Sequence, residues 1–272
     1  MMKEGLLHLT AFQVASLRIV FAGLVLLPSA IINFKKVPAG KLGIIFISGV
    51  LGSLLPAYLF CVAELGIDSA LAGTLNSLTP IFVIITGALF FRSKTSSNKI
   101  FGIGVAFTGS ILLLLSKGQI PENQNLMYIS YVVLATICYG FNVNMVHKHL
   151  HHIGSLQIAS VALTLNAIPA LVVLYFTGYF SLPLSDSGIL YSTGHAALLG
   201  ILGTAVASII FYVLIKRAGA VFSSMVTYGI PVIANLWGLF YGEEVGWVQF
   251  GCLALILTGV YLANRKISKT GS

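Results

Sequence analysis

Charged residues are scarce in this chain. Only 8% of its 272 residues are Asp, Glu, Lys or Arg, against about 25% in soluble globular domains. By contrast, 57% of the residues are hydrophobic, and the mean hydropathy is +0.98. A soluble fold of this length could not hide so much apolar surface, because every folded protein keeps a large accessible surface. The scarcity of charge therefore excludes a soluble domain and indicates an integral membrane protein.

Cysteine is also rare, and acidic residues are few. Cys61, Cys138 and Cys252 lie inside apolar stretches, without the spacing of metal ligands or of a disulfide framework. The histidines at 147–152 lack Cys or carboxylate partners, so we interpret them as a solvated helix end. The net charge of +8 comes from basic residues in separate short links, with no groove of interleaved aromatics. The sequence thus predicts no metal site, no cofactor and no nucleic-acid partner.

Long apolar stretches dominate what is present. A membrane-spanning helix needs about 20 mostly apolar residues, and nine stretches qualify, joined by short links. They run approximately over residues 11–33, 42–65, 69–91, 99–116, 126–147, 156–178, 193–215, 220–241 and 247–264. The expected fold class is all-α and polytopic, with about nine transmembrane helices.

The basic residues lie on one side of the predicted spans. Twelve of the fifteen Lys and Arg residues fall in the links after the first, third, fifth and seventh stretches or in the C-terminal tail. The positive-inside bias places these segments, and hence the C-terminus, in the cytoplasm. We therefore expect an integral protein of the cytoplasmic (inner) membrane, with its N-terminus outside.

Two parts of the chain resemble each other. In both 70–80 and 220–231, a run of small and polar residues ends at a proline. A spaced glycine pair follows each run, at Gly102 and Gly109 and at Gly251 and Gly259. Matching the stretches backwards pairs the second with the seventh and the first with the sixth, but leaves the fifth without a partner. That partner would lie upstream of the first residue, so we expect two sets of five helices with the first helix missing.

An odd number of spans in each repeat forces the two copies into opposite orientations. This is the inverted-repeat architecture of secondary transporters, in which the substrate site lies between the repeats near the bilayer midplane. We expect the first repeat, without its first helix, to cover residues 1–118 and the second to cover residues 119–272.

Three stretches resemble the EamA-type ten-helix permeases of the drug/metabolite transporter superfamily. Residues 9–23, which include Arg18, resemble the second helix of that family, and residues 70–80 resemble the fourth. Residues 228–259, with Pro231 followed twelve residues later by Glu243, resemble the ninth and tenth. The resemblance covers essentially the whole chain. It implies a permease rather than an enzyme, and specifically an exporter of small metabolites such as amino acids.

Polar residues inside the apolar stretches are the candidates for a substrate site, because intramembrane polarity is costly. Arg18, the only basic residue deep in a span, could bind a substrate carboxylate or phosphate, snorkel outward or pair with a protein carboxylate. Pro80 and Pro231 predict helix kinks that either line a cavity or are purely structural. The neutral candidates are Asn76, Thr79, Tyr139, Asn142, Thr227 and Tyr228.

Spacing along single helices gives two further expectations. Asn142 and Asn144 are two residues apart and cannot share one helix face, so at most one should face a cavity. Gly102, Ala106 and Ser110 recur every four residues, which predicts a close helix contact. That contact could join the two halves of the chain or two copies in a homodimer.

The sequence contains no phosphate-binding G-x-x-x-x-G-K-[ST] loop, so we expect transport without direct use of ATP. The acidic residues lie near the outer side and no histidine is mid-span, so no intramembrane carboxylate relay is expected. An intramembrane enzyme is an alternative, as is an inactive, truncated membrane scaffold. The expected partners are a small-molecule substrate and the lipid bilayer.

Overall fold

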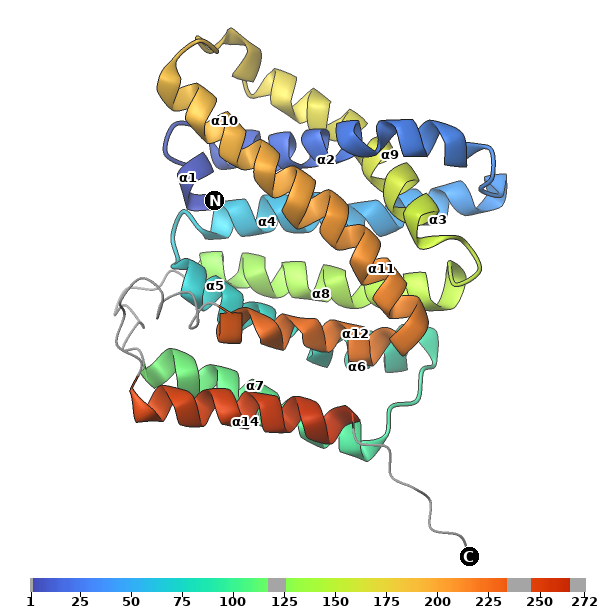
Figure 1. Ribbon diagram of the computed structural model, residues 1–272, viewed down its shortest axis with the longest axis vertical. Coiled ribbons are helices and arrows are strands. Elements are labelled where there is room, and N and C mark those ends of the chain that lie inside the picture. Colours follow the sequence, from blue (N-terminus) through green and yellow to red (C-terminus); the bar gives the residue numbers. More distant parts are fainter. Residues whose placement is uncertain (1, 117–125, 234–245, 265–272) are drawn as a thin grey trace, which may run out of the picture.

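The computed structural model describes residues 2–116, 126–233 and 246–264 (Figure 1). Eight helices in this part are long and apolar enough to cross a membrane. The ninth predicted span, 220–241, is described only to Ile233, as the shorter apolar helix Ala220–Ile233. The rest of that span, residue 243 and the basic C-terminal tail lie outside the described residues. The polytopic, all-helical fold class is thus confirmed.

The helices follow one another through short links. Those before residue 118 are α1 (Met2–Gly5), α2 (Ala11–Phe34), α3 (Ala39–Gly49), η1 (Val50–Leu54), α4 (Leu55–Ala63), α5 (Ser69–Asn76), α6 (Thr79–Phe91) and α7 (Ser97–Ser116). Those after it are α8 (Leu126–His149), α9 (Ser155–Phe176), η2 (Tyr179–Ser181), α10 (Ser187–Gly200), η3 (Ile201–Val206), α11 (Ala207–Ala218), α12 (Ala220–Ser224), η4 (Met225–Tyr228) and α14 (Trp247–Asn264).

One helix boundary differs clearly from the expectation. The seventh span begins at Ser187 rather than near residue 193, and it continues through α10, η3 and α11 to Ala218. The side chain of Asp186 accepts hydrogen bonds from the backbone N–H groups of Gly188 (2.9 Å) and Ile189 (3.2 Å). This N-cap satisfies donors that a helix start would otherwise leave unpaired, so a polar turn begins the helix before its apolar run.

The helices α2 and α9 begin in the same way. In each, a glutamine side chain accepts a hydrogen bond from the backbone N–H three residues earlier, as Gln13 does from Thr10 (3.0 Å) and Gln157 from Gly154 (2.9 Å). The three residues after each glutamine also match: a β-branched residue comes first, then an alanine, then a serine. The two helices then cross closely, because a Cβ on Gly23 would lie 2.6 Å from the Cβ of Ala167. The first and sixth predicted spans are therefore neighbours.

The helices α7 and α14 form a second close pair, side by side in Figure 1. A Cβ on Gly102 would lie 2.6 Å from the carbonyl oxygen of Gly259, and a Cβ on Gly259 would lie 2.6 Å from that of Gly102. The Gly259 Cβ would also lie 2.3 Å from the backbone nitrogen of Ala106. The stripe of small residues on α7 thus packs against the other half of the same chain.

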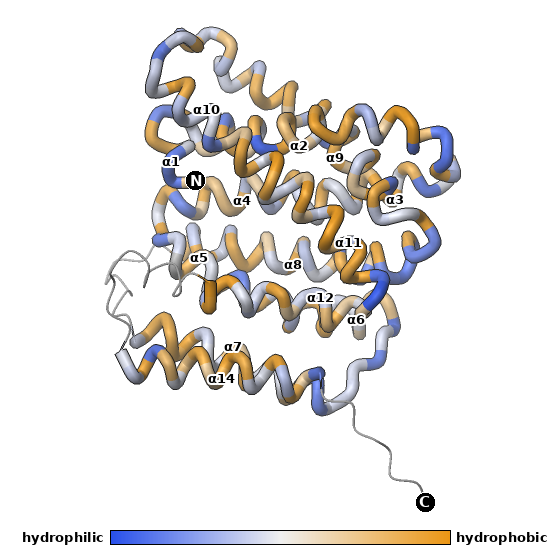
Figure 2. Tube along the Cα trace, in the orientation of Figure 1, coloured by the Kyte–Doolittle hydropathy of each residue, from blue (hydrophilic) through white to orange (hydrophobic). Residues whose placement is uncertain are grey.

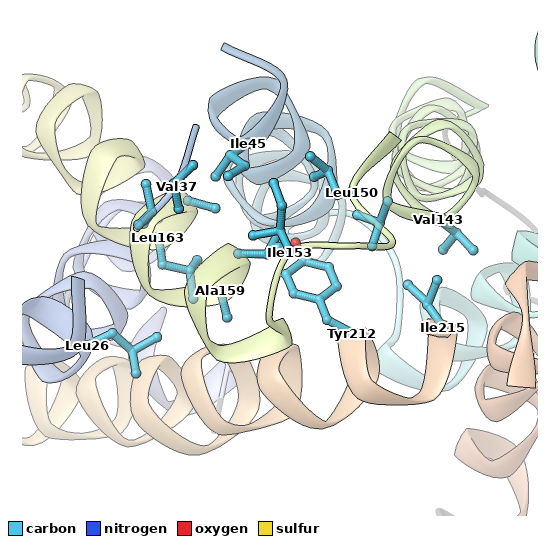
Figure 3. Packing of buried hydrophobic residues seen from close by; sticks show 14 of the residues in the cluster. Leu26, Val37, Ile45, Val143, Leu150, Ile153, Ala159, Leu163, Tyr212 and Ile215 are labelled. Carbon is cyan, nitrogen blue, oxygen red and sulfur yellow. The ribbon is translucent and has the colours of Figure 1, made fainter. Parts of the chain in front are cut away.

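Apolar residues cover most of each helix, while hydrophilic residues gather at the helix ends and links (Figure 2). The largest buried cluster joins α2, α3, α8, α9 and α11. Figure 3 shows Val143, Leu150 and Ile153 on one side of it facing Tyr212 and Ile215 of α11. Because this cluster draws on both halves of the chain, it holds them together.

Candidate functional site

Two spans are interrupted by π-helical turns at corresponding places. The turn η1 lies between α3 and α4, and η3 lies between α10 and α11. Their sequences share a pattern, with Gly52–Ser53 after Leu51 and Gly203–Thr204 after Leu202. Such turns widen a helix locally and occur often at functional sites. The second and seventh spans, paired in the sequence, thus carry the same irregularity.

A glycine just before each π-turn lets a neighbouring helix approach. A Cβ on Gly49 would lie 3.1 Å from the carbonyl oxygen of Ala162 on α9, and one on Gly200 would lie 2.4 Å from that of Arg18 on α2. Each π-turn is therefore held against a helix of the opposite half, η1 against α9 and η3 against α2, and the backbone at Arg18 is fixed by this contact.

Two other spans are broken at the prolines. Ser77 and Leu78 separate α5 from α6, and Pro80 lies in the first turn of α6. The 3-10 turn η4 precedes Pro231 in the same way. Both prolines were expected to kink a continuous helix; instead, the irregular turn comes before each one. The reason is that proline fits the first turn of a helix. Backbone N–H groups there have no partner within the helix, so the N–H that proline lacks costs no hydrogen bond.

These irregular turns surround one cavity of about 480 Å³. The volume is within the range of small-molecule sites. Of the seven candidate residues, six line it: Arg18, Asn76, Thr79, Tyr139, Asn142 and Thr227. Lining residues that the sequence analysis missed include Ser53, Thr204, Ser208 and Tyr212. The repeated Leu-Gly-Ser/Thr pattern of the two π-turns is the signal that could have identified Ser53 and Thr204.

Arg18 lies about 10 Å from the start of α2, given a rise of 1.5 Å per residue. Its Nε donates a hydrogen bond to Oγ1 of Thr204 at 2.6 Å, so it joins α2 to the π-turn η3. Across the described ranges, the one ion pair within 4 Å is Lys3–Asp68. Arg18 is thus a charge within a membrane-spanning helix, and no carboxylate in this part of the chain lies within 4 Å of it.

The two neighbouring asparagines on α8 face different surroundings, as their spacing predicts. Asn142 lines the cavity, and its Oδ1 accepts a hydrogen bond from Ser48 at 2.6 Å. Tyr212 of α11 also lies close to these two side chains, so α3, α8 and α11 meet at this point. Asn144 instead packs against α6, where its Nδ2 donates to the carbonyl oxygen of Val83 at 2.8 Å.

Tyr228, a predicted site residue, does not line the cavity. Its side chain is 1% exposed, and its hydroxyl donates to the carbonyl oxygen of Ile103 on α7 at 3.1 Å. Successive residues of a 3-10 turn point about 120° apart, so Thr227 faces the cavity while Tyr228 is buried against α7. Tyr228 therefore packs against α7 and is not part of the cavity.

Among the acidic residues of the described chain, Glu64 has a buried carboxylate oxygen. It caps the C-terminus of α4, and its Oε2 is buried without a hydrogen-bond partner. It does not line the cavity. The position agrees with the expectation that acidic residues lie at the ends of spans and not at the centre.

Comparison with known proteins identifies the family. The sequence matches the EamA-like transporter family over residues 1–115 and 126–265. It is 27% identical over 268 residues to an uncharacterized transporter from Archaeoglobus fulgidus, covering 97% of this chain and 92% of that protein. Among solved structures, the fold is similar to a protein crystal structure with a TM-score of 0.73 and 17% identity, over 97% of this chain and 90% of the other. The protein is a membrane transporter, and it belongs to the EamA-like transporter family.

Proposed function

We propose that the protein is a secondary transporter that exports small metabolites, such as amino acids or related compounds, and that the cavity at Arg18 is its substrate site. The observation that carries this proposal is that both halves of the chain contribute equivalent elements to the cavity wall. One π-turn and one broken helix from each half meet there, through Gly52, Asn76, Gly203 and Thr227. We also propose that the repeats divide near residue 118.

This arrangement suits alternating access. In transporters built from inverted repeats, one repeat moves against the other around a site at their interface. The Arg18–Thr204 and Ser48–Asn142 hydrogen bonds both cross between residues 1–118 and the later half. A relative movement of the halves would therefore rearrange the polar groups that contact the substrate.

Flux through purified protein in liposomes tests the proposal directly. Liposomes loaded with an unlabelled amino acid should take up the same labelled compound by counterflow, and Thr79→Ala or Tyr139→Phe should change the apparent KM. Ser185→Ala, on the exposed link before α10, is the matched control and should behave as the parent. Counterflow equal to that of empty liposomes, across aliphatic, aromatic and polar amino acids, would refute the proposed substrates.

A pH gradient should not drive accumulation. Proton-coupled carriers commonly hold a titratable group inside the spans, whereas Glu64 lies at a helix end outside the cavity. We expect Glu64→Gln to keep at least about half of the downhill flux, with parent and variant alike showing no concentrative uptake under an imposed pH gradient. Concentrative uptake that disappears in Glu64→Gln would show that Glu64 is the coupling residue.

We propose that the protein lies in the cytoplasmic membrane with a cytoplasmic C-terminus. In a variant without Cys61, Cys138 and Cys252, a single cysteine is placed at one of two exposed serines. Ser185→Cys, between α9 and α10, should react with an impermeant thiol reagent in intact cells. Ser96→Cys, between α6 and α7, should react only after permeabilisation, and the reverse pattern would invert the topology.

A further inference from the structure

We propose that the cavity selects metabolites that carry one net negative charge, held at Arg18. It should bind such an anion more tightly than the zwitterionic amino acid of the same shape. The inference rests on the proposed function, since it names the substrate class of the same cavity. The proposed function includes both anionic and zwitterionic metabolites, whereas this inference ranks the anions above the zwitterions.

The first argument is the charge of the cavity. Among the described residues that line it, Arg18 is the one that is charged, and no Asp or Glu is present. The ion pair between Lys3 and Asp68 joins two half-exposed side chains, and Arg18 has no carboxylate within 4 Å in the described part. Glu64 interacts with Arg18 electrostatically, but from a helix end outside the cavity. An unpaired charge inside a membrane protein is costly. A bound anion would remove this cost.

The second argument is the hydrogen-bonding capacity of Arg18 itself. A guanidinium has five N–H donors and no acceptor, and the described structure uses only the Nε donor, toward Thr204. This bond orients the side chain, and neither Nη group donates a hydrogen bond to a described residue. Two such groups form paired hydrogen bonds with a carboxylate, an arrangement stronger than a bond between neutral groups.

The neutral amides in the cavity present donors as well. The Thr79 hydroxyl donates to Oδ1 of Asn76 at 3.1 Å, and the Ser48 hydroxyl donates to Oδ1 of Asn142. Each amide oxygen is thereby occupied, so the NH₂ side of each amide is left for a ligand. Thr227 uses its proton on the carbonyl oxygen of Ser224 and leaves only a neutral acceptor. An ammonium group would find no carboxylate here, while a carboxylate would find several donors.

Adding the charges gives an order of affinity. A monoanion makes the cavity and ligand together neutral, a zwitterion leaves one positive charge, and an amine without a carboxylate leaves two. Because charges interact more strongly away from water, we expect the anion to bind best and the amine worst. An anion should bind about tenfold or more tightly than its zwitterion, equivalent to about 1.4 kcal/mol.

Matched ligands of one shape test this order. The aromatic side chains of Tyr139, Phe211 and Tyr212 line the cavity, so the main series is 3-phenylpropanoate, L-phenylalanine and 2-phenylethylamine at neutral pH. A second series is 4-methylpentanoate, L-leucine and 3-methylbutylamine. Binding is measured on the purified full chain from the ligand-dependent rise in Tm, and flux is measured separately in liposomes.

Three variants identify Arg18 as the source of the preference. Arg18→Gln should weaken anion binding by about tenfold to a hundredfold, since a bond to a charged group contributes about 1.5–3 kcal/mol. It should also let the amine bind as well as the anion, a gain that misfolding could not produce. Arg18→Lys should keep the order of preference, and Arg217→Gln, an exposed residue at the end of α11, should match the parent.

The outcomes separate this inference from the proposed function. Tighter binding by the anion, lost in Arg18→Gln, supports the inference even if no flux is found, in which case the transport proposal fails. Saturable flux of the amine, or tighter binding of the zwitterion, overturns the inference and leaves transport standing. A rise in Tm with none of the carboxylates in either series would also overturn it.

Discussion

Replacing Gly102 by valine should destabilise the protein strongly. The new Cβ would lie 2.4 Å from the backbone nitrogen of Ala263 and 2.6 Å from the carbonyl oxygen of Gly259. Backbone atoms cannot move aside as a flexible side chain can, so α7 and α14 would have to separate. Overpacking of this kind costs about 1–3 kcal/mol, and we expect a value at the upper end.

Gly104→Val is the matched control on the same helix. Gly104 is exposed, and nothing lies within 4 Å of a Cβ placed there. Both substitutions change the helix propensity of α7 alike, so only the contact with α14 differs. The Tm in detergent and the fraction of monodisperse protein should fall for Gly102→Val and stay near the parent values for Gly104→Val. Equal values for the two variants would mean that α7 and α14 do not pack through Gly102.

Changing each of the two asparagines of α8 to leucine should have opposite effects: Asn144→Leu should lower stability, and Asn142→Leu should lower flux. Asn144 is 3% exposed, and its Nδ2 donates to Val83, to Thr86 and to Gly140 of its own helix. Removing these bonds should lower stability by about 1–2 kcal/mol, given the modest strength of single hydrogen bonds between membrane helices. Flux per folded molecule should fall only slightly, because Asn144 does not line the cavity.

Asn142→Leu should instead abolish most of the flux while the Tm changes less. Its amide lines the cavity and bonds to Ser48, so the substitution removes a polar group from the site and adds apolar bulk there. Flux and Tm measured on the same two preparations give the comparison. A loss of flux in Asn144→Leu with normal Tm, together with normal flux in Asn142→Leu, would exchange the roles of the two residues.

The sequence by itself determined the features that depend on the solvent around the chain. Spans need long apolar stretches, so eight long helices lie on stretches that hydropathy predicts, although the seventh begins earlier, at Ser187. The proline pair also marked the broken spans correctly. It did not show that the irregular turns precede Pro80 and Pro231, because proline statistics do not distinguish a kink from a new first turn.

The tertiary structure alone decided which side chains meet. In lipid, the face of a helix that packs against protein and the face that meets the bilayer are both apolar, so periodicity cannot tell them apart. Tyr228 and Thr227 look equally suitable in the sequence, yet only Thr227 lines the cavity. Arg18 and Thr204 are 186 residues apart and bond because Gly200 lets α10 approach the backbone of α2. Such a contact depends on the crossing of two helices, which the pattern within either one does not encode.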